Sequence, residues 1–221
     1  MNNAKNNKLM TIFAHQDDET FSAGGVLLKY QLSYAVSITK DDNRVSEFEK
    51  ACELLETNPI QLNFRNVTNS NFEDIKSELV RIIQEFKPDI IITHIDFDYH
   101  KEHKITNEIV KEAVEWASHT SNPDKEAHQV KSLWGTETTV LIPFPHIYID
   151  ISKENEMRMK AIAVYESQSH KGGEGFYSNY HETRTHLRGI QASTEHAEAF
   201  INIPIALSGS FKPTKYYNEF P

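Results

Sequence analysis

The chain of 221 residues has a single cysteine, Cys52, which excludes an intrachain disulfide. Cys52 lies among the apolar positions of a predicted helix, so we expect it to be a small core residue. Residues 1–7 are a polar lead-in and lack the apolar core of a signal peptide. No apolar run approaches the length that would cross a membrane. These absences predict a soluble, cytoplasmic protein without a membrane partner.

Positive charge is scarce: 23 Lys and Arg residues stand against 32 Asp and Glu residues, giving a net charge of −9. Binding to nucleic acid or to an anionic membrane surface requires a basic patch, so the sequence argues against both partners. Neutral or cationic small molecules remain open, as does an anionic ligand held by a few local arginines. Hydrophobic residues make up 38% and charged residues 25%, which is typical of a globular protein with a polar surface.

Predicted strands and helices alternate through the first two-thirds of the chain. Strands are expected at 9–13, 34–39, 60–64 and 90–93, and helices at 21–31, 45–55, 72–86 and 105–117. This alternation predicts a Rossmann-like, three-layer α/β fold with a mostly parallel central sheet. The first strand-to-helix turn lacks a Gly-x-Gly-x-x-Gly sequence, which argues against a dinucleotide site.

The last third of the chain is less regular. We expect strands at 132–134, 138–142 and 147–151, a helix at 157–165, a mobile glycine-containing loop at 170–180, a helix at 187–200 and a polar tail after Ile203. We find no internal repeat and no sign of a second domain, so residues 1–221 are predicted to form one domain. An assembly of identical subunits stays open.

Polar side chains crowd the turn after the first strand, where His15 is followed by Asp17, Asp18 and Glu19. Ligands bind at such turns in open α/β sheets. A helix N-terminus attracts one capping acid, whereas three neighbouring acids repel one another unless a cation shares their charge. The alternative is a capping acid with two solvated neighbours and an incidental histidine.

A second polar cluster follows the strand at 90–93 and leads into the next helix. It runs from Thr93 to His103 and contains His94, Asp98, His100 and Glu102. If the two strands are close in the sheet, both clusters share one edge and can converge. Because the chain has eleven histidines, a solvated acidic loop with scattered histidines is the alternative. We expect the following histidines at the surface: His119, His128 and His146. The following stay open as pocket residues: His170, His181, His186 and His196.

The residue types in the two clusters suit metal-assisted hydrolysis. His15 and Asp18 can face one point from a single turn, and His103 could supply a third ligand. Two imidazoles and a carboxylate with an open position suit a catalytic Zn²⁺, and the same set suits Fe²⁺. Asp17 would lie beside the ion as a general base. His100 could stabilise an oxyanion, oriented by Glu102 or an upstream acid.

At these residues the chain resembles the PIG-L/LmbE-like superfamily of metal-dependent N-deacetylases. The family sequence Ala-His-Pro-Asp-Asp-Glu corresponds to residues 14–19, where Gln16 replaces the proline. The second family motif, His-Pro-Asp-His, corresponds to residues 100–103 and is preceded by Asp98 and Tyr99. The resemblance implies zinc binding by His15, Asp18 and His103. It also implies that Asp17 is the general base and that His100 polarises the amide.

Weaker family features extend over nearly the whole chain. Residues 44–47 resemble the family's Arg-x-x-Glu, so Arg44 is a candidate substrate contact, together with Asp98 and Tyr99; a surface arginine paired with Glu47 is the alternative. Three features depart from the family. They are Glu102 in place of the aspartate that orients the catalytic histidine, Tyr165 where many members have histidine, and a short acidic loop at 40–43 where relatives often carry a glycine-rich one.

The predicted function is therefore metal-dependent removal of an acetyl group from an N-acetylated sugar or sugar conjugate of the N-acetylglucosamine type. One alternative is a deacetylase or amidase that acts on a natural-product or other non-sugar amide. A second alternative is a catalytically silent carbohydrate-binding relative, and a third is a structural α/β module. The structural module would not need two acidic strand ends.

Overall fold

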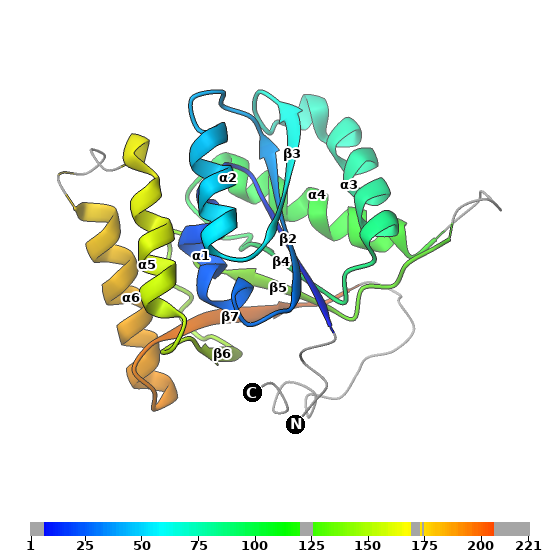
Figure 1. The fold of residues 1–221 in the computed structure, drawn as a ribbon. Coiled ribbons are helices and arrows are strands. Elements are labelled where there is room, and N and C mark those ends of the chain that lie inside the picture. Colours follow the sequence, from blue (N-terminus) through cyan, green and yellow to red (C-terminus); the bar gives the residue numbers. More distant parts are fainter. Residues whose placement is uncertain (1–6, 120–125, 169–172, 174, 206–221) are drawn as a thin grey trace.

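The structure, a computed structural model, describes residues 7–119, 126–168, 173 and 175–205. Its centre is a seven-stranded sheet with helices on both faces (Figure 1). The strand order is β3-β2-β1-β4-β5-β7-β6. Strands β3, β2, β1, β4 and β5 are parallel, whereas β7 runs antiparallel to β5 and to β6. The predicted α/β fold with a mostly parallel sheet is confirmed.

The elements follow one another in alternating order through β5. The strands are β1 (Lys8–Phe13), β2 (Leu32–Thr39), β3 (Asn58–Phe64), β4 (Ile90–His94), β5 (Ser132–Thr136), β6 (Ile147–Asp150) and β7 (Ala197–Ile203). The helices are α1 (Asp18–Leu27), α2 (Val45–Leu54), α3 (Phe72–Phe86), α4 (Lys101–Ala117), α5 (Asn155–Val164) and α6 (Phe176–Ala192). Two short 3₁₀ helices are η2 (Asn69–Asn71) and η3 (Glu166–Gln168).

Strands β1 and β4 lie side by side in the middle of the sheet, with Leu9 opposite Ile90 and Thr11 opposite Ile92. Both strands are almost completely buried, which explains their continuous apolar sequences. Because they are parallel neighbours, their carboxyl ends meet at the same edge of the sheet. The two polar clusters of the sequence therefore lie next to each other.

Two large apolar cores and one small one lie between the sheet and its helices. One core contains residues of α3 and α4, such as Ile75, Leu79 and Ile109, packed with Met10 and Ile91 of the sheet. The other large core contains residues of α1 and α5, including Phe21 and Ile162, together with Trp134 and Phe200. The apolar positions of α3 recur every three or four residues, so this helix buries one face and exposes the other.

Three predictions in the last third of the chain are wrong. Residues 138–142 do not form a strand, because buried arginines of α6 bind the carbonyl groups of Glu137, Thr138 and Ile142 in place of a neighbouring strand. The predicted helix at 187–200 is instead the end of α6 followed by β7. The predicted loop at 170–180 contains the first turns of α6, and residues 169–172 and 174 lie outside the described residues.

The error at 187–200 has a physical cause. Helix α6 ends at Ala192, where Ser193 takes a left-handed conformation with φ of 60°. The next segment has the charged Glu198 between Ala197 and Ala199, and these residue types are also typical of an exposed helix face. In the structure Glu198 is buried against the side chain of Arg158 and a backbone N–H group of α1. Burial of this ion pair inside the fold is invisible to a local sequence pattern.

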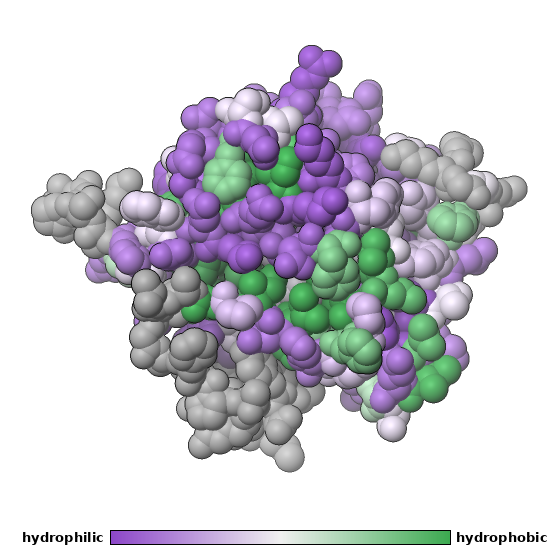
Figure 2. Space-filling view, turned by 180° about the vertical axis from the view of Figure 1, so that it is seen from behind, coloured by the Kyte–Doolittle hydropathy of each residue, from purple (hydrophilic) through white to green (hydrophobic). Residues whose placement is uncertain are grey.

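The face of the molecule opposite to that seen in Figure 1 is mainly hydrophilic. Seen from behind, hydrophilic residues cover the upper part of the molecule, and hydrophobic residues are gathered among hydrophilic ones in the middle (Figure 2). Phe144, which is 85% exposed, is the most exposed large hydrophobic residue of the described chain. No helix in the described ranges is both long and apolar enough to cross a membrane.

Candidate active site

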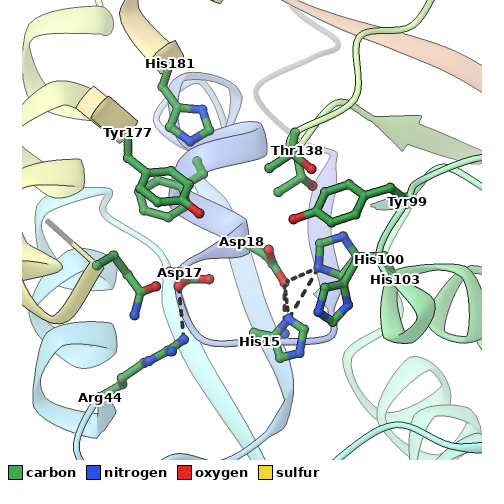
Figure 3. Close-up of a pocket in the computed structure, with 13 residues that line it drawn as sticks. His15, Asp17, Asp18, Arg44, Tyr99, His100, His103, Thr138, Tyr177 and His181 are labelled. Carbon is green, nitrogen blue, oxygen red and sulfur yellow. Dashed lines mark hydrogen bonds and ion pairs between the residues drawn. The ribbon is translucent and has the colours of Figure 1, made fainter. Parts of the chain in front are cut away.

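The loops after β1 and β4 bring their polar side chains into one cavity. His15, Asp17 and Asp18 come from the β1–α1 loop and the start of α1, while His100 and His103 come from the start of α4 (Figure 3). The cavity has a volume of about 420 Å³. Figure 3 shows the histidines of both loops gathered around Asp18, whereas Asp17 is directed toward Arg44.

Three of these side chains place electron-pair donors very close together. His15 Nδ1 lies 3.2 Å from Asp18 Oδ2 and 3.3 Å from His103 Nε2, and His103 Nε2 lies 3.6 Å from Asp18 Oδ2. A tetrahedral zinc ion with bonds of about 2.0–2.1 Å holds its ligand atoms about 3.3–3.4 Å apart. The sequence-predicted donor set of His15, Asp18 and His103 therefore has the spacing that a metal ion requires.

Asp98 prepares His103 for such a role. Its carboxylate oxygen Oδ2 lies 3.2 Å from Nδ1 of His103, which favours a proton on Nδ1 and leaves Nε2 as the ring nitrogen that faces His15 and Asp18. Asp98 is buried and accepts a hydrogen bond from the backbone N–H of His100, at 2.9 Å. Asp98 is not among the residues that line the cavity, so the structure places it behind the two histidines.

His94 is a histidine that the sequence analysis left without a role. Among the described residues, two further donor groups overlap this set and could hold a metal ion: His15, His100 and His103 form one, and Asp18, His94 and His103 form the other. His94 is fully buried, and its Nε2 accepts the backbone N–H of Ala14 at 3.1 Å. That hydrogen bond occupies the lone pair nearest Asp18, which favours His15 over His94 as a ligand. The sequence could have indicated a role for His94, because this residue lies at the end of a predicted buried strand.

The electrostatics of the cavity favour a positive charge beside Asp18. Burial alone lowers the pKa of His15, but hydrogen bonds with Asp18 and Glu102 raise it to about 10. Burial raises the pKa of Asp18, but His103 and His94 outweigh it and hold the pKa well below its usual range. Asp18 is therefore a carboxylate at neutral pH, and either a proton on His15 or a metal ion can balance its charge.

Asp17 occupies a strained position at the start of α1. Its φ of 122° lies in a region that residues other than glycine rarely adopt. Its backbone N–H donates to Glu19 Oε2 at 3.0 Å, and Glu19 is held in turn by Tyr165, whose hydroxyl donates at 2.6 Å. These contacts keep Asp17 in place, so Glu19 and Tyr165 support the loop from behind.

The carboxylate of Asp17 faces Arg44, whose Nη1 lies 3.1 Å from Oδ2. Burial and the charge of Asp18 raise the pKa of Asp17, and the guanidinium of Arg44 opposes this shift. Arg44 lines the cavity, which is where a substrate contact would have to lie. The alternative pairing of Arg44 with Glu47 does not occur, because Glu47 accepts hydrogen bonds from the backbone N–H and hydroxyl of Ser167.

His100 lines the cavity next to His15, with ring centroids 5.1 Å apart and rings nearly perpendicular. Burial and the neighbouring His103 lower its pKa. Glu102, predicted to orient His100, makes different contacts. Its Oε2 lies 3.5 Å from His15 Nε2 and accepts the backbone N–H of Val67 at 2.8 Å. The upstream acid Asp98 is the carboxylate that binds the backbone of His100.

Helix α6 supplies one wall of the cavity that the sequence analysis did not assign. Tyr177 lies parallel to Phe21 at 5.7 Å, and His181 lies parallel to Phe21 at 4.6 Å. Tyr177 and the 68% exposed Tyr99 extend toward the space above Asp17 and Asp18 from opposite sides (Figure 3). The aromatic residues between 176 and 181 could have indicated a cavity wall, but most of this segment was predicted to be a loop.

Imidazoles and carboxylates that converge at the strand ends of a mostly parallel sheet define a class of α/β proteins with a candidate hydrolytic metal site. A family model described as GlcNAc-PI de-N-acetylase (PIG-L) matches residues 10–114, which include both polar clusters. Over these residues the chain is similar to the PIG-L family.

Solved structures with the same fold cover nearly the whole chain. A conserved protein of Thermus thermophilus has a TM-score of 0.80 and 17% identity, covering 94% of this chain and 99% of that one. N,N'-diacetylchitobiose deacetylase from Pyrococcus horikoshii has a TM-score of 0.77 and 20% identity, covering 94% and 87%. GalB, the 4-carboxy-2-hydroxymuconate hydratase from Pseudomonas putida, has a TM-score of 0.77 and 16% identity, and the match covers 93% of this chain and 100% of that one. At these identities the likeness concerns the fold alone.

Proposed function

We propose that this protein is a metal-dependent N-deacetylase that acts on an N-acetylated sugar or sugar conjugate of the N-acetylglucosamine type. The observation that carries the proposal is the trio of His15, Asp18 and His103 donor atoms, 3.2–3.6 Å apart, in one cavity with Asp17 and His100. The match of residues 10–114 to the family described as GlcNAc-PI de-N-acetylase supports the same reaction class.

His15, Asp18 and His103 would hold the metal ion, for which Zn²⁺ and Fe²⁺ both suit two imidazoles and one carboxylate. When bound, such an ion supplies Lewis acidity toward water and toward the carbonyl oxygen of an amide. The Asp98 carboxylate beside His103 Nδ1 keeps the opposite ring nitrogen of His103 available as a donor.

Asp17 is the group placed to move a proton. Its carboxylate accepts a proton from the water that attacks the acetamide carbonyl and then delivers it to the nitrogen of the departing amine. Arg44, 3.1 Å away, keeps part of the negative charge of Asp17 balanced while the proton is absent. His100 lies across the cavity and donates a hydrogen bond to the carbonyl oxygen as negative charge develops there.

The cavity favours a neutral substrate of about the size of a sugar unit. Its volume of about 420 Å³ lies within the range of small-molecule sites, about 300–1,000 Å³. Tyr99 and Tyr177 offer aromatic faces and hydroxyl groups on opposite sides, which suits a ring with both apolar faces and polar substituents. Because Arg44 balances the charge of Asp17 and the metal ion would balance that of Asp18, the cavity needs no charge on the ligand.

The test is the metal content of the purified protein, measured beside acetate release from a panel of N-acetylglucosamine conjugates and N-acetylated amines without a sugar. We expect about one zinc or iron ion per chain and acetate release from the sugar conjugates. Both should be lost in His103→Ala and retained in His119→Ala, a matched change at an exposed histidine.

Other outcomes separate the alternatives. Acetate release only from N-acetylated amines without a sugar would favour the alternative of a deacetylase that acts on a natural-product or other non-sugar amide. Metal binding without acetate from any amide would favour a silent binding protein. A protein that takes up no metal, even after incubation with zinc or iron, would contradict the proposal.

A further inference from the structure

Gln16 stands where the family motif has proline, and its side chain makes a contact that proline could not make. The residue is 1% exposed, and its Oε1 accepts the backbone N–H of Asp41 at 2.8 Å. Asp41 belongs to the turn between β2 and α2. The side chain of Gln16 therefore joins the β1–α1 loop, which carries Asp17 and Asp18, to the turn that carries Arg44.

The turn from Asp41 to Arg44 is held together by its own hydrogen bonds. The backbone N–H of Arg44 donates to Asp41 O at 2.9 Å, and the backbone N–H of Asn43 donates to Asp41 Oδ1 at 3.0 Å. Before the turn, the backbone N–H and the hydroxyl of Thr39 both donate to Ala14 O, at 2.9 and 2.8 Å. Because these hydrogen bonds tie Arg44 to Asp41, holding Asp41 in place also holds the backbone of Arg44 in place.

The side chain of Arg44 contacts the β1–α1 loop, which is the loop that binds the Asp41–Arg44 turn through Gln16. Its Nη1 lies 3.4 Å from the carbonyl oxygen of Gln16 and 3.1 Å from Oδ2 of Asp17. The two loops are thus joined twice, once through the side chain of Gln16 and once through the side chain of Arg44. Loss of the contact through Gln16 should therefore let the turn move and weaken the contact of Arg44 with Asp17.

We propose that Gln16 is a positioning residue that holds the Asp41–Arg44 turn so that Arg44 reaches Asp17. This chain uses a buried glutamine side chain to place the arginine, at a position where the family motif has no side-chain hydrogen-bonding group. The effect on catalysis rests on the proposed deacetylase function, whereas the effect on the turn does not.

Hydrogen exchange at the amide of Asp41 tests the structural part. Gln16→Leu removes the acceptor and should speed exchange at this amide about fivefold to tenfold, because the hydrogen bond that protects it is lost. Gln16→Glu keeps an acceptor at the same place and should retain the protection. The matched control is Gln84→Leu, which removes hydrogen bonds to the carbonyls of Ala117 and His119 far from the turn and should leave Asp41 unchanged. Unchanged exchange in Gln16→Leu would overturn the proposal.

A double-mutant cycle tests the catalytic part. Gln16→Leu should lower kcat/KM about tenfold when Arg44 is present and should have no further effect in Arg44→Ala, because both changes remove the same contact with Asp17. A merely structural role of Gln16 would give losses that add. Equal losses in both backgrounds would therefore overturn the positioning role. A wild-type protein without deacetylase activity would contradict the proposed function instead, and amide exchange would still decide the role of Gln16.

Discussion

At the scale of single residues, the catalytic proposal depends most on Asp17. Its carboxylate is buried, lies between Asp18 and Arg44, and is carried on backbone with φ of 122°. Such backbone strain costs about 1–3 kcal/mol and persists where the surroundings enforce it. The contacts of Glu19 and Tyr165 enforce it here. The loop thus keeps the carboxylate of Asp17 in the cavity, beside the donor atoms of His15, Asp18 and His103.

Asp17→Asn should lower kcat about 10²-fold to 10⁴-fold, because an amide cannot accept the proton of the attacking water. Metal content should be retained, since His15, Asp18 and His103 are unchanged. The measurement is the rate of acetate release beside metal analysis. Asp42→Asn, the same change at a side chain 89% exposed on the facing turn, should leave the rate unchanged. An unaffected rate in Asp17→Asn would reject Asp17 as the general base.

At the scale of elements, the backbone of α6 at Gly189 lies so close to the turn after the helix that no residue other than glycine fits there. A Cβ atom added at Gly189 would lie 2.3 Å from the carbonyl oxygen of Glu195 and 2.8 Å from the backbone nitrogen of His196. The backbone N–H of Thr194 donates to the carbonyl oxygen of Gly189 at 2.9 Å. This close approach returns the chain from α6 into β7, and α6 carries the aromatic wall of the cavity.

Gly189→Ala should lower the free energy of unfolding by about 2 kcal/mol or more, because the new methyl group meets backbone atoms that cannot move aside. The measurement is urea unfolding followed by circular dichroism. Gly24→Ala is the matched control in α1, where the nearest atom is a side-chain carbon of Arg158 at 3.3 Å. This change should alter the free energy by less than about 1 kcal/mol. Equal effects of the two changes would contradict the predicted close approach.

At the scale of the whole molecule, the interior beneath the cavity contains several buried charged and polar groups. Arg158 pairs with Glu198, Arg188 pairs with Glu137, and Arg184 donates to the carbonyl groups of Glu137 and Thr138. His181 is fully buried among them. Burial and the charges of Arg184 and Arg158 hold its pKa well below 6.5, so it is neutral in the folded protein.

The stability of the whole protein should therefore depend on pH through His181. Below pH 6.5 the unfolded chain protonates this histidine, whereas the folded protein keeps it neutral. The unfolded state then binds more protons, and the free energy of unfolding falls as the pH drops below 6.5. Above pH 6.5 His181 is neutral in both states and adds no dependence on pH.

His181→Phe should reduce the loss of stability between pH 7 and pH 5, because phenylalanine does not titrate and can keep the stacking on Phe21. The measurement is urea unfolding at several pH values at constant metal concentration. His186→Phe, at an exposed position on the same helix, should leave the loss as it is in the wild type. The same loss in His181→Phe and wild type would show that His181 is protonated equally in both states.

Local patterns were sufficient to predict the first two-thirds of the fold, because β1 and β4 are continuous apolar runs buried on both faces and α3 has the apolar periodicity of a helix that buries one face. They failed in the last third, where Glu198 and the arginines of α5 and α6 are buried in contact with carboxylates and carbonyl groups. A sequence pattern treats charge as exposure, and only the folded contacts show when charges are buried in pairs.

For this protein, the sequence alone determined the mostly parallel sheet and the two polar clusters at strand ends, since hydrophobic periodicity and motif spacing are properties of neighbouring residues. Only the tertiary structure decided which donor atoms meet. It placed Glu102 against His15, Asp98 behind His103, His94 against the backbone of Ala14, and Arg44 beside Asp17. These contacts join loops far apart in the chain, and their geometry depends on strand order and register.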